Sequence, residues 1–222
     1  MKKIYTWAAQ PANRTLTVDD LKKAKGKKKF TQVTANTIDE AEAAEKAGFD
    51  MIIWNAFNVK QVREGSKNLF LTAALVLNKF VTSEDIMRGA FEALENGADA
   101  VMTPRSMKIV EMLANEDVPV MGHLGILPQS TKGKFKSKGK TEIEKVILLK
   151  EAKLLEDAGV FAIVLECVKT NTSKLITNSI KIPTVGIGSS VYCDGQVLVT
   201  DDMLGLNKAN IRFVKKFVNL KK

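Results

Sequence analysis

The segment AKLLEDAGVFAIVLE (Ala152–Glu166) decides the fold, because it joins an amphipathic helix, a glycine and a short apolar strand. The same order recurs in AEAAEKAGFDMIIW (Ala41–Trp54) and AFEALENGADAVMT (Ala90–Thr103). The glycines that follow the last helical turn are Gly48, Gly97 and Gly159. Glycine suits that position because it accepts the left-handed conformation that ends a helix. The residues after each glycine are too few and too rich in β-formers for a helix, so they predict strands.

The rest of the chain continues this alternation of strands and helices. Further strands are expected at residues 30–35, 69–76, 118–121 and 183–187. Helices are expected to begin near Thr37, Ser83, Arg105, Thr141 and Asn171. Such alternation favours a parallel sheet, and seven or eight units predict an α/β fold with a single (β/α)8 TIM barrel. An open doubly wound sheet is the alternative, but no GxGxxG or GxxxxGK[ST] fingerprint follows the first strand.

The length of 222 residues is typical of one barrel domain. We expect residues 1–28 to form an N-terminal arm with one short helix, and residues 29–206 to form the barrel. Residues 207–222 are expected to form a C-terminal helix. The apolar side chains at helical spacing in this segment are Ile211, Val214, Phe217 and Val218. That helix would pack against the barrel or against a neighbouring subunit.

Composition narrows the possible partners. The chain has 34 Lys and Arg against 25 Asp and Glu, a formal charge of +9. The lysines gather at 22–29 and 132–140 with almost no aromatic residues to stack on bases, so nucleic-acid binding is not expected. The second cluster follows the GHLG turn and is expected to draw acidic ligands to an active-site mouth. No apolar run reaches the ~20 residues of a membrane span. Cys167 and Cys193 have no CxxC spacing, so a reduced, cytoplasmic protein is expected.

The candidate site residues follow from the barrel, whose active-site groups come from the C-terminal ends of the strands. Glu166 ends an apolar run and is expected to be partly desolvated, so that it carries a proton near neutral pH. The alternative is a rim carboxylate paired with a lysine. His123, the only histidine, is a candidate substrate contact or hydrogen-bonded scaffolding, and it excludes a three-histidine metal site. The backbone N–H groups of Gly188 and Ser189 could hold a carboxylate or phosphate.

Residues 83–206 resemble the ketopantoate hydroxymethyltransferases, through GHLGILPQS, VLECV, GIG and DGQVLV. These enzymes add a hydroxymethyl group to 3-methyl-2-oxobutanoate on the way to pantothenate. The resemblance implies a barrel of the phosphoenolpyruvate mutase and isocitrate lyase type that forms a homo-oligomer. It implies a small 2-oxo acid as substrate, methylenetetrahydrofolate as co-substrate and Mg²⁺ as cofactor. It also implies that Glu166 removes a proton from the acid and that His123 contacts it.

The chain departs from the family pattern at the metal ligands. The family's Gly-Asp-Ser, Ala-Asp and Lys-Leu-Glu segments are replaced by residues 55–57, 73–74 and 102–104. None of these replacements carries a carboxylate, and Mg²⁺ requires several oxygen ligands, carboxylates above all. We therefore expect no metal site built by the protein. Arg105 and Asn55 are candidates to bind the substrate in place of the cation, although Arg105 could instead only open a surface helix.

Three functions are therefore compatible with the sequence. The first is the family reaction, in an enzyme that tolerates the change in its metal site or has rebuilt that site. The second is a metal-independent lyase or aldolase acting on another 2-oxo or dicarboxylic acid. The third is a homologue that binds a ligand without catalysis, for which ligand-induced thermal stabilisation would be the only response.

Overall fold

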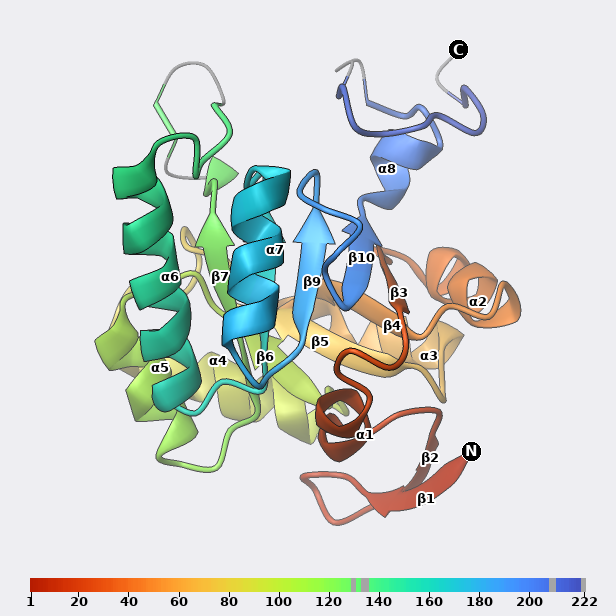
Figure 1. Ribbon diagram of the computed structural model, residues 1–222. Coiled ribbons are helices and arrows are strands. Elements are labelled where there is room, and N and C mark those ends of the chain that lie inside the picture. The colour runs from red at the N-terminus through yellow and green to blue at the C-terminus, as the bar shows by residue number, and fades with distance from the viewer. Residues whose placement is uncertain (129–130, 133–135, 208–210, 221–222) are drawn as a thin grey trace.

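Eight parallel strands close into a barrel in the computed structural model, which describes residues 1–128, 131–132, 136–207 and 211–220. The neighbours around the barrel follow the order β10-β3-β4-β5-β6-β7-β8-β9 (Figure 1). These strands are β3 (Phe30–Thr34), β4 (Met51–Asn55), β5 (Phe70–Ala74), β6 (Ala100–Met102), β7 (Val120–Gly125), β8 (Ala162–Glu166), β9 (Thr184–Ile187) and β10 (Gly195–Leu198). The closed order confirms the predicted (β/α)8 barrel and excludes the open sheet.

Helices cover the outside of this barrel (Figure 1). They are α2 (Ile38–Lys46), α3 (Val59–Gly65), α4 (Ser83–Glu95), α5 (Met107–Ala114), α6 (Glu142–Asp157) and α7 (Thr170–Ser179), with a short 3-10 helix η1 (Ala56–Asn58) before α3. Residues 188–194 join β9 to β10 by turns rather than by a helix. Within the described ranges, none of the helices has both the length and the apolar character required to cross a membrane.

The three glycines of the repeated segment end their helices in the predicted way. Gly48, Gly97 and Gly159 have φ values of 77°, 102° and 92°. After α2, the N–H of Gly48 donates to Glu45 and the N–H of Phe49 donates to Ala44. The same paired bonds follow α4 and α6, which satisfies the last carbonyl groups of each helix. Each helix therefore stops at its glycine and leaves the chain free to enter the next strand.

Two layers of apolar side chains hold the barrel together. One fills the inside of the barrel and includes Phe30, Met51, Phe70, Met121 and Phe161. The other lies between the strands and the surrounding helices. The strands are buried on both faces, as expected when helices cover a parallel sheet. The large interior side chains Phe30, Met51 and Phe70 are the first residues of their strands, and the cavity lies toward the other end.

The N-terminal residues cover the end of the barrel at which the strands begin. A hairpin of β1 (Lys2–Tyr5) and β2 (Pro11–Arg14) precedes α1 (Val18–Lys23), the short helix expected in this arm. Leu21 of α1 belongs to the interior cluster that also contains Phe30. The hairpin, which the sequence did not reveal, is fixed by Arg14, whose Nε donates to Asp99 at 2.7 Å.

The expected helix over residues 207–222 is wrong for the part of it that the structure describes, because residues 211–220 form turns and irregular segments. The backbone N–H of Phe217 donates to the carbonyl of Met203, and that of Leu220 donates to Leu204. These long-range bonds take the place of a helical ladder and fold the segment back on α8 (Thr200–Met203). Residues 208–210 and 221–222 of the expected helix lie outside the described ranges.

Candidate active site

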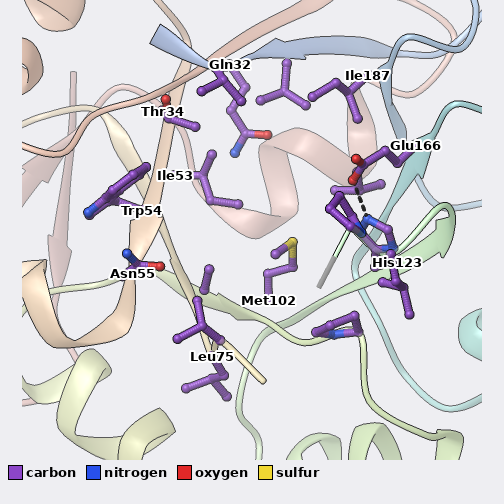
Figure 2. Close-up of a pocket in the computed structure, with 18 of the residues that line it drawn as sticks. Gln32, Thr34, Ile53, Trp54, Asn55, Leu75, Met102, His123, Glu166 and Ile187 are labelled. Atoms are coloured by element: carbon purple, nitrogen blue, oxygen red, sulfur yellow. Dashed lines mark hydrogen bonds and ion pairs between the residues drawn. The ribbon is translucent and has the colours of Figure 1, made fainter. Parts of the chain in front are cut away.

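A cavity of about 260 Å³ opens at the C-terminal ends of the barrel strands. Its walls are mostly apolar, and they include Ile53, Leu75, Met102, Val164, Ile187 and Val197. Polar groups enter from opposite sides, with Gln32 and Asn55 on one side and His123 and Glu166 on the other (Figure 2). A small, mainly apolar cavity with a few convergent polar groups is the usual form of a small-molecule site.

His123 and Glu166 form the polar centre of this cavity. They come from the neighbouring strands β7 and β8, and His123 Nε2 lies 3.0 Å from Glu166 Oε2 (Figure 2). The His123 side chain is 5% exposed and that of Glu166 is 20% exposed. The other ring nitrogen, Nδ1, is buried and has no partner among the described residues. The pair can hold one proton at the Nε2–Oε2 contact, donated by the imidazole or by a protonated carboxyl group.

The expected GHLG turn is wrong, because these four residues continue strand β7, and the backbone of Glu166 requires the second glycine, Gly125, at its end. Gly125 has a φ of 104°, and a methyl group on its Cα would collide with the carbonyl oxygen of Glu166. That carbonyl accepts a hydrogen bond from the N–H of Ile126 at 2.9 Å. Strands β7 and β8 therefore approach closely where the catalytic candidate Glu166 and the substrate-contact candidate His123 lie, and only glycine fits at position 125.

Asn55 lies where the sequence predicts, on the cavity wall at the end of β4. In the strand order β4 is directly opposite β8. The side-chain amide of Asn55 therefore faces the His123–Glu166 pair across the cavity (Figure 2). Ala74 and Pro104 also line the cavity. The segments 55–57, 73–74 and 102–104, which the sequence analysis singled out, therefore each contribute a residue to the cavity lining.

Arg105 is not among the residues that line the cavity. Its guanidinium Nη2 donates to the carbonyl groups of Leu77 and Phe80 at 2.8 and 2.6 Å. Leu77 lines the cavity, so Arg105 fastens a segment of the wall. These hydrogen bonds favour a structural role for Arg105, as an anchor of the cavity wall, over direct binding of a substrate carboxylate.

Gly188 and Ser189 also lie outside the cavity lining. The Ser189 hydroxyl donates to the carbonyl of Leu165 at 2.6 Å and accepts from the N–H of Val168 at 3.0 Å. Gly188 has a φ of 58° and lies against the ring of Phe213. These contacts join the ends of β8 and β9 and seat the C-terminal segment, rather than presenting N–H groups to the cavity.

Gln32 and Thr34 of β3 line the cavity, and sequence reasoning missed both. The available signal was the alternation of polar residues 32 and 34 in a strand, which places both side chains on one face. Thr34 Oγ1 accepts from the N–H of Thr200 at 2.9 Å, so its hydroxyl is engaged by the protein. Gln32 is not engaged in this way.

The donor groups of the cavity fit a divalent metal ion poorly. Among the lining residues of the described chain, Glu166 is the single carboxylate, and it is in contact with His123. Nor do the described residues contain a cluster of three or more His, Cys, Asp or Glu able to hold a metal. Amide and hydroxyl oxygens remain, from Gln32, Thr34 and Asn55. Hard ions such as Mg²⁺ depend on carboxylates for tight binding, so these neutral donors are weak ligands.

The comparisons with known sequences agree on one protein family. Residues 55–222 match the family model described as ketopantoate hydroxymethyltransferase. A 3-methyl-2-oxobutanoate hydroxymethyltransferase of Pelagibacter ubique is 44% identical over 184 residues, which cover 81% of this chain and 70% of that protein. The enzyme of the same name from Kosmotoga olearia is 38% identical over 227 residues, covering 90% of this chain and 85% of the relative.

Solved structures with the same fold come from a broader group. A 2,3-dimethylmalate lyase, described as a member of the PEP mutase/isocitrate lyase superfamily, aligns with a TM-score of 0.62 at 10% identity. The alignment covers 82% of this chain and 81% of the lyase. A phosphonopyruvate hydrolase in complex with oxalate and Mg²⁺ aligns with a TM-score of 0.55 at 15% identity, over 78% of this chain and 72% of that one. At such identities the likeness concerns the fold alone.

Proposed function

Since this chain belongs to the ketopantoate hydroxymethyltransferase family, we propose that it transfers a hydroxymethyl group to a small 2-oxo acid bound beside Glu166. The acid is 3-methyl-2-oxobutanoate, the one-carbon donor is methylenetetrahydrofolate, and the product serves pantothenate synthesis. The observation that carries this proposal is the contact between His123 and Glu166 inside the cavity. Assembly into a homo-oligomer stays a prediction.

Glu166 is the proposed general base. Its carboxylate removes the proton from C3 of the acid, and the electron pair of the broken C–H bond moves into the adjacent carbonyl to give an enolate. The methylene carbon of the donor then exchanges its two C–N bonds for a bond to C3 and a bond to the oxygen of water, so that tetrahydrofolate leaves. The proton taken from C3 and one proton from water pass to the two nitrogens of the departing tetrahydrofolate. A positioned base of this kind contributes roughly 10²- to 10⁴-fold to a rate. His123 holds the carboxylate in place and shares its proton.

The shape of the cavity supports a short branched acid. Its volume of about 260 Å³ is close to the lower end of the sizes common for ligand sites. The apolar side chains of Ile53, Leu75 and Val164 suit the branched alkyl end of the acid, whose carboxylate and 2-oxo oxygens require the polar wall. A larger acid would have to project through the mouth.

The proposed reaction uses no metal held by the protein. Mg²⁺ would polarise the 2-oxo group, but the carboxylates that would hold it are absent from residues 55, 74 and 104 of this sequence. Neutral amide donors on the opposite wall are the available partners for the negative charge of the enolate. Preorganised N–H donors of this kind stabilise developing oxyanions effectively in a site shielded from water.

The test is product formation from 3-methyl-2-oxobutanoate and methylenetetrahydrofolate, followed by mass spectrometry, with EDTA present. We expect ketopantoate from the wild-type protein and none from Glu166→Gln. A matched control is Glu142→Gln, because Glu142 is 85% exposed and lies on α6 away from the cavity. Thermal stabilisation by the acid without any product would identify a ligand-binding homologue and overturn the proposal.

A further inference from the structure

Gln32 occupies an unusual place inside the barrel. It lies in the middle of β3, its side chain faces the interior, and only 2% of the residue is exposed. Its amide points into the cavity, toward the space in front of Glu166 (Figure 2). The residue paired with it in register on β10 is Val197, and the one on β4 is Met51, so its neighbours across both strand pairs are apolar.

Neither polar atom of this amide is satisfied by the described protein. Nε2 and Oε1 are both buried and lack a hydrogen-bond partner. Leaving a buried donor or acceptor unpaired costs about 1–3 kcal/mol, and most buried polar groups in native proteins therefore have partners. Methionine has nearly the same length and would fill the position without this cost. The amide is thus unfavourable for the free protein unless something in the cavity pairs with it.

A bound acid has the chemistry that this amide lacks. The carboxylate and 2-oxo oxygens are acceptors, and the amide N–H₂ group is a donor. Glu166 is an acceptor when ionised and already contacts His123, while Thr34 is bonded to Thr200. Gln32 is therefore a buried lining residue with an unpaired donor for an anionic ligand. Trp54 Nε1 and His123 Nδ1 are also buried and unpaired among the described lining residues, but Trp54 packs against the outer apolar cluster and His123 already contacts Glu166 through its other ring nitrogen.

We propose that Gln32 is a positioning residue that donates its amide N–H to an oxygen of the bound 2-oxo acid and so aims C3 at Glu166. This assignment rests on the proposed function and adds to it a specific anchor. An amide donor compensates for part of the charge stabilisation that a metal would supply. A buried water is the competing partner, since the cavity has room for one.

The experiment measures binding of 3-methyl-2-oxobutanoate alone by calorimetry, without folate, so that no turnover is needed. Gln32→Met removes both polar atoms and keeps the length of the side chain. We expect its dissociation constant to rise by roughly 10- to 100-fold, the equivalent of losing a hydrogen bond to a charged group. Its melting temperature without ligand should be at least that of the wild type. Gln32→Asn keeps the amide donor on a side chain shorter by one methylene, and its affinity for the acid should fall less than that of Gln32→Met.

Thr72→Val provides the matched control. Thr72 of β5 is also fully buried, and its hydroxyl is without a partner in the described structure, yet it is not a lining residue of the cavity. Its replacement should leave the affinity for the acid unchanged. In steady-state kinetics Gln32→Met should raise KM alone if the amide holds the carboxylate, and should lower kcat if it holds the 2-oxo oxygen.

Two failures can be told apart. Unchanged affinity and kinetics in Gln32→Met, with a wild type that binds the acid, would overturn the role of Gln32 and assign its amide to water. If Gln32→Met does not fold, unchanged affinity in Gln32→Asn would lead to the same conclusion. A folded wild type that binds no 2-oxo acid would overturn the proposed function and this assignment together.

Discussion

The imidazole of His123 reaches the carboxylate of Glu166 from one strand to the next, with 3.0 Å between Nε2 and Oε2. Gly125 is the register partner of Glu166, so His123 lies two residues before the level of the carboxylate. The contact turns the carboxylate into the cavity and limits its freedom to face solvent. We infer that His123 acts through Glu166, as the residue that sets the position of the base.

Replacing His123 tests this relationship. His123→Leu removes the donor and should lower the rate of ketopantoate formation by roughly 10- to 100-fold, because a hydrogen bond to a charged group is worth about 1.5–3 kcal/mol. His123→Gln keeps an N–H group at a similar reach and should restore most of that loss. Equal activity in the Leu and Gln variants, measured under the same conditions, would contradict a role for the contact.

Gly125 should tolerate no side chain. Gly125→Ala places a methyl group against the carbonyl oxygen of Glu166 and should lower both the melting temperature and the rate. Gly48→Ala is the control, because Gly48 also has a positive φ but open space around its Cα. That change should lower the free energy of unfolding by about 1–2 kcal/mol, because alanine is disfavoured in the left-handed conformation, and should leave the rate unchanged. Equal effects of the two substitutions on the rate would argue against a steric cause.

The metal-free character of the site can be tested by restoring carboxylates. Asn55 and Ala74 are register partners on β4 and β5 and both line the cavity. The double substitution Asn55→Asp and Ala74→Asp should therefore create a site that binds Mn²⁺, observed by electron paramagnetic resonance. The wild type should bind no Mn²⁺ in the same titration, and EDTA should not change its activity. Tight Mn²⁺ binding by the wild type would contradict the expectation.

The buried carboxylate of Asp194 should make the stability of the protein sensitive to acid. Burial alone would raise the pKa of Asp194, but hydrogen bonds from Lys25 and from the backbone N–H groups of Thr184 and Gly26 outweigh it and lower the pKa below the ordinary 3.8. Because the folded pKa is depressed, its contribution to stability is complete above pH 3.8 and is lost as the pH falls through the folded value.

The free energy of unfolding, measured by urea titration between pH 6 and roughly pH 2, should thus depend less on acid in Asp194→Asn than in the wild type. The exposed Asp39→Asn is the control and should keep the wild-type dependence. A pH dependence in Asp194→Asn as steep as that of the wild type would contradict the assignment.

The barrel could be predicted because its signals are local. The glycine after each helix and the apolar run that follows are both visible in Ala152–Glu166, and the structure reproduces them with the same hydrogen bonds in all three copies. Glu166 and His123 could be placed at strand ends for the same reason. Their mutual contact is a consequence of strand order, which the barrel topology supplies.

The remaining features depend on contacts between distant residues. The apolar spacing of residues 211–218 predicts a helix, yet Phe213 packs on Gly188 and the backbone bonds to Met203 and Leu204. Arg105 donates hydrogen bonds to the backbone carbonyls of Leu77 and Phe80, a contact that no sequence pattern predicts. Gln32 was missed because polar residues fall on both faces of β3, Thr31 on one and Gln32 and Thr34 on the other, so the pattern does not indicate which face lines a cavity.

The most direct test of the account is exchange of the C3 proton of 3-methyl-2-oxobutanoate in D₂O, followed by proton NMR with EDTA present and folate absent. Wild-type protein should replace this proton by deuterium, so that the methyl doublet collapses to a singlet. Glu166→Gln should slow the exchange by at least about 100-fold, the usual contribution of a positioned base. Exchange that proceeds equally well in Glu166→Gln would show that another group removes the proton and would contradict the central claim.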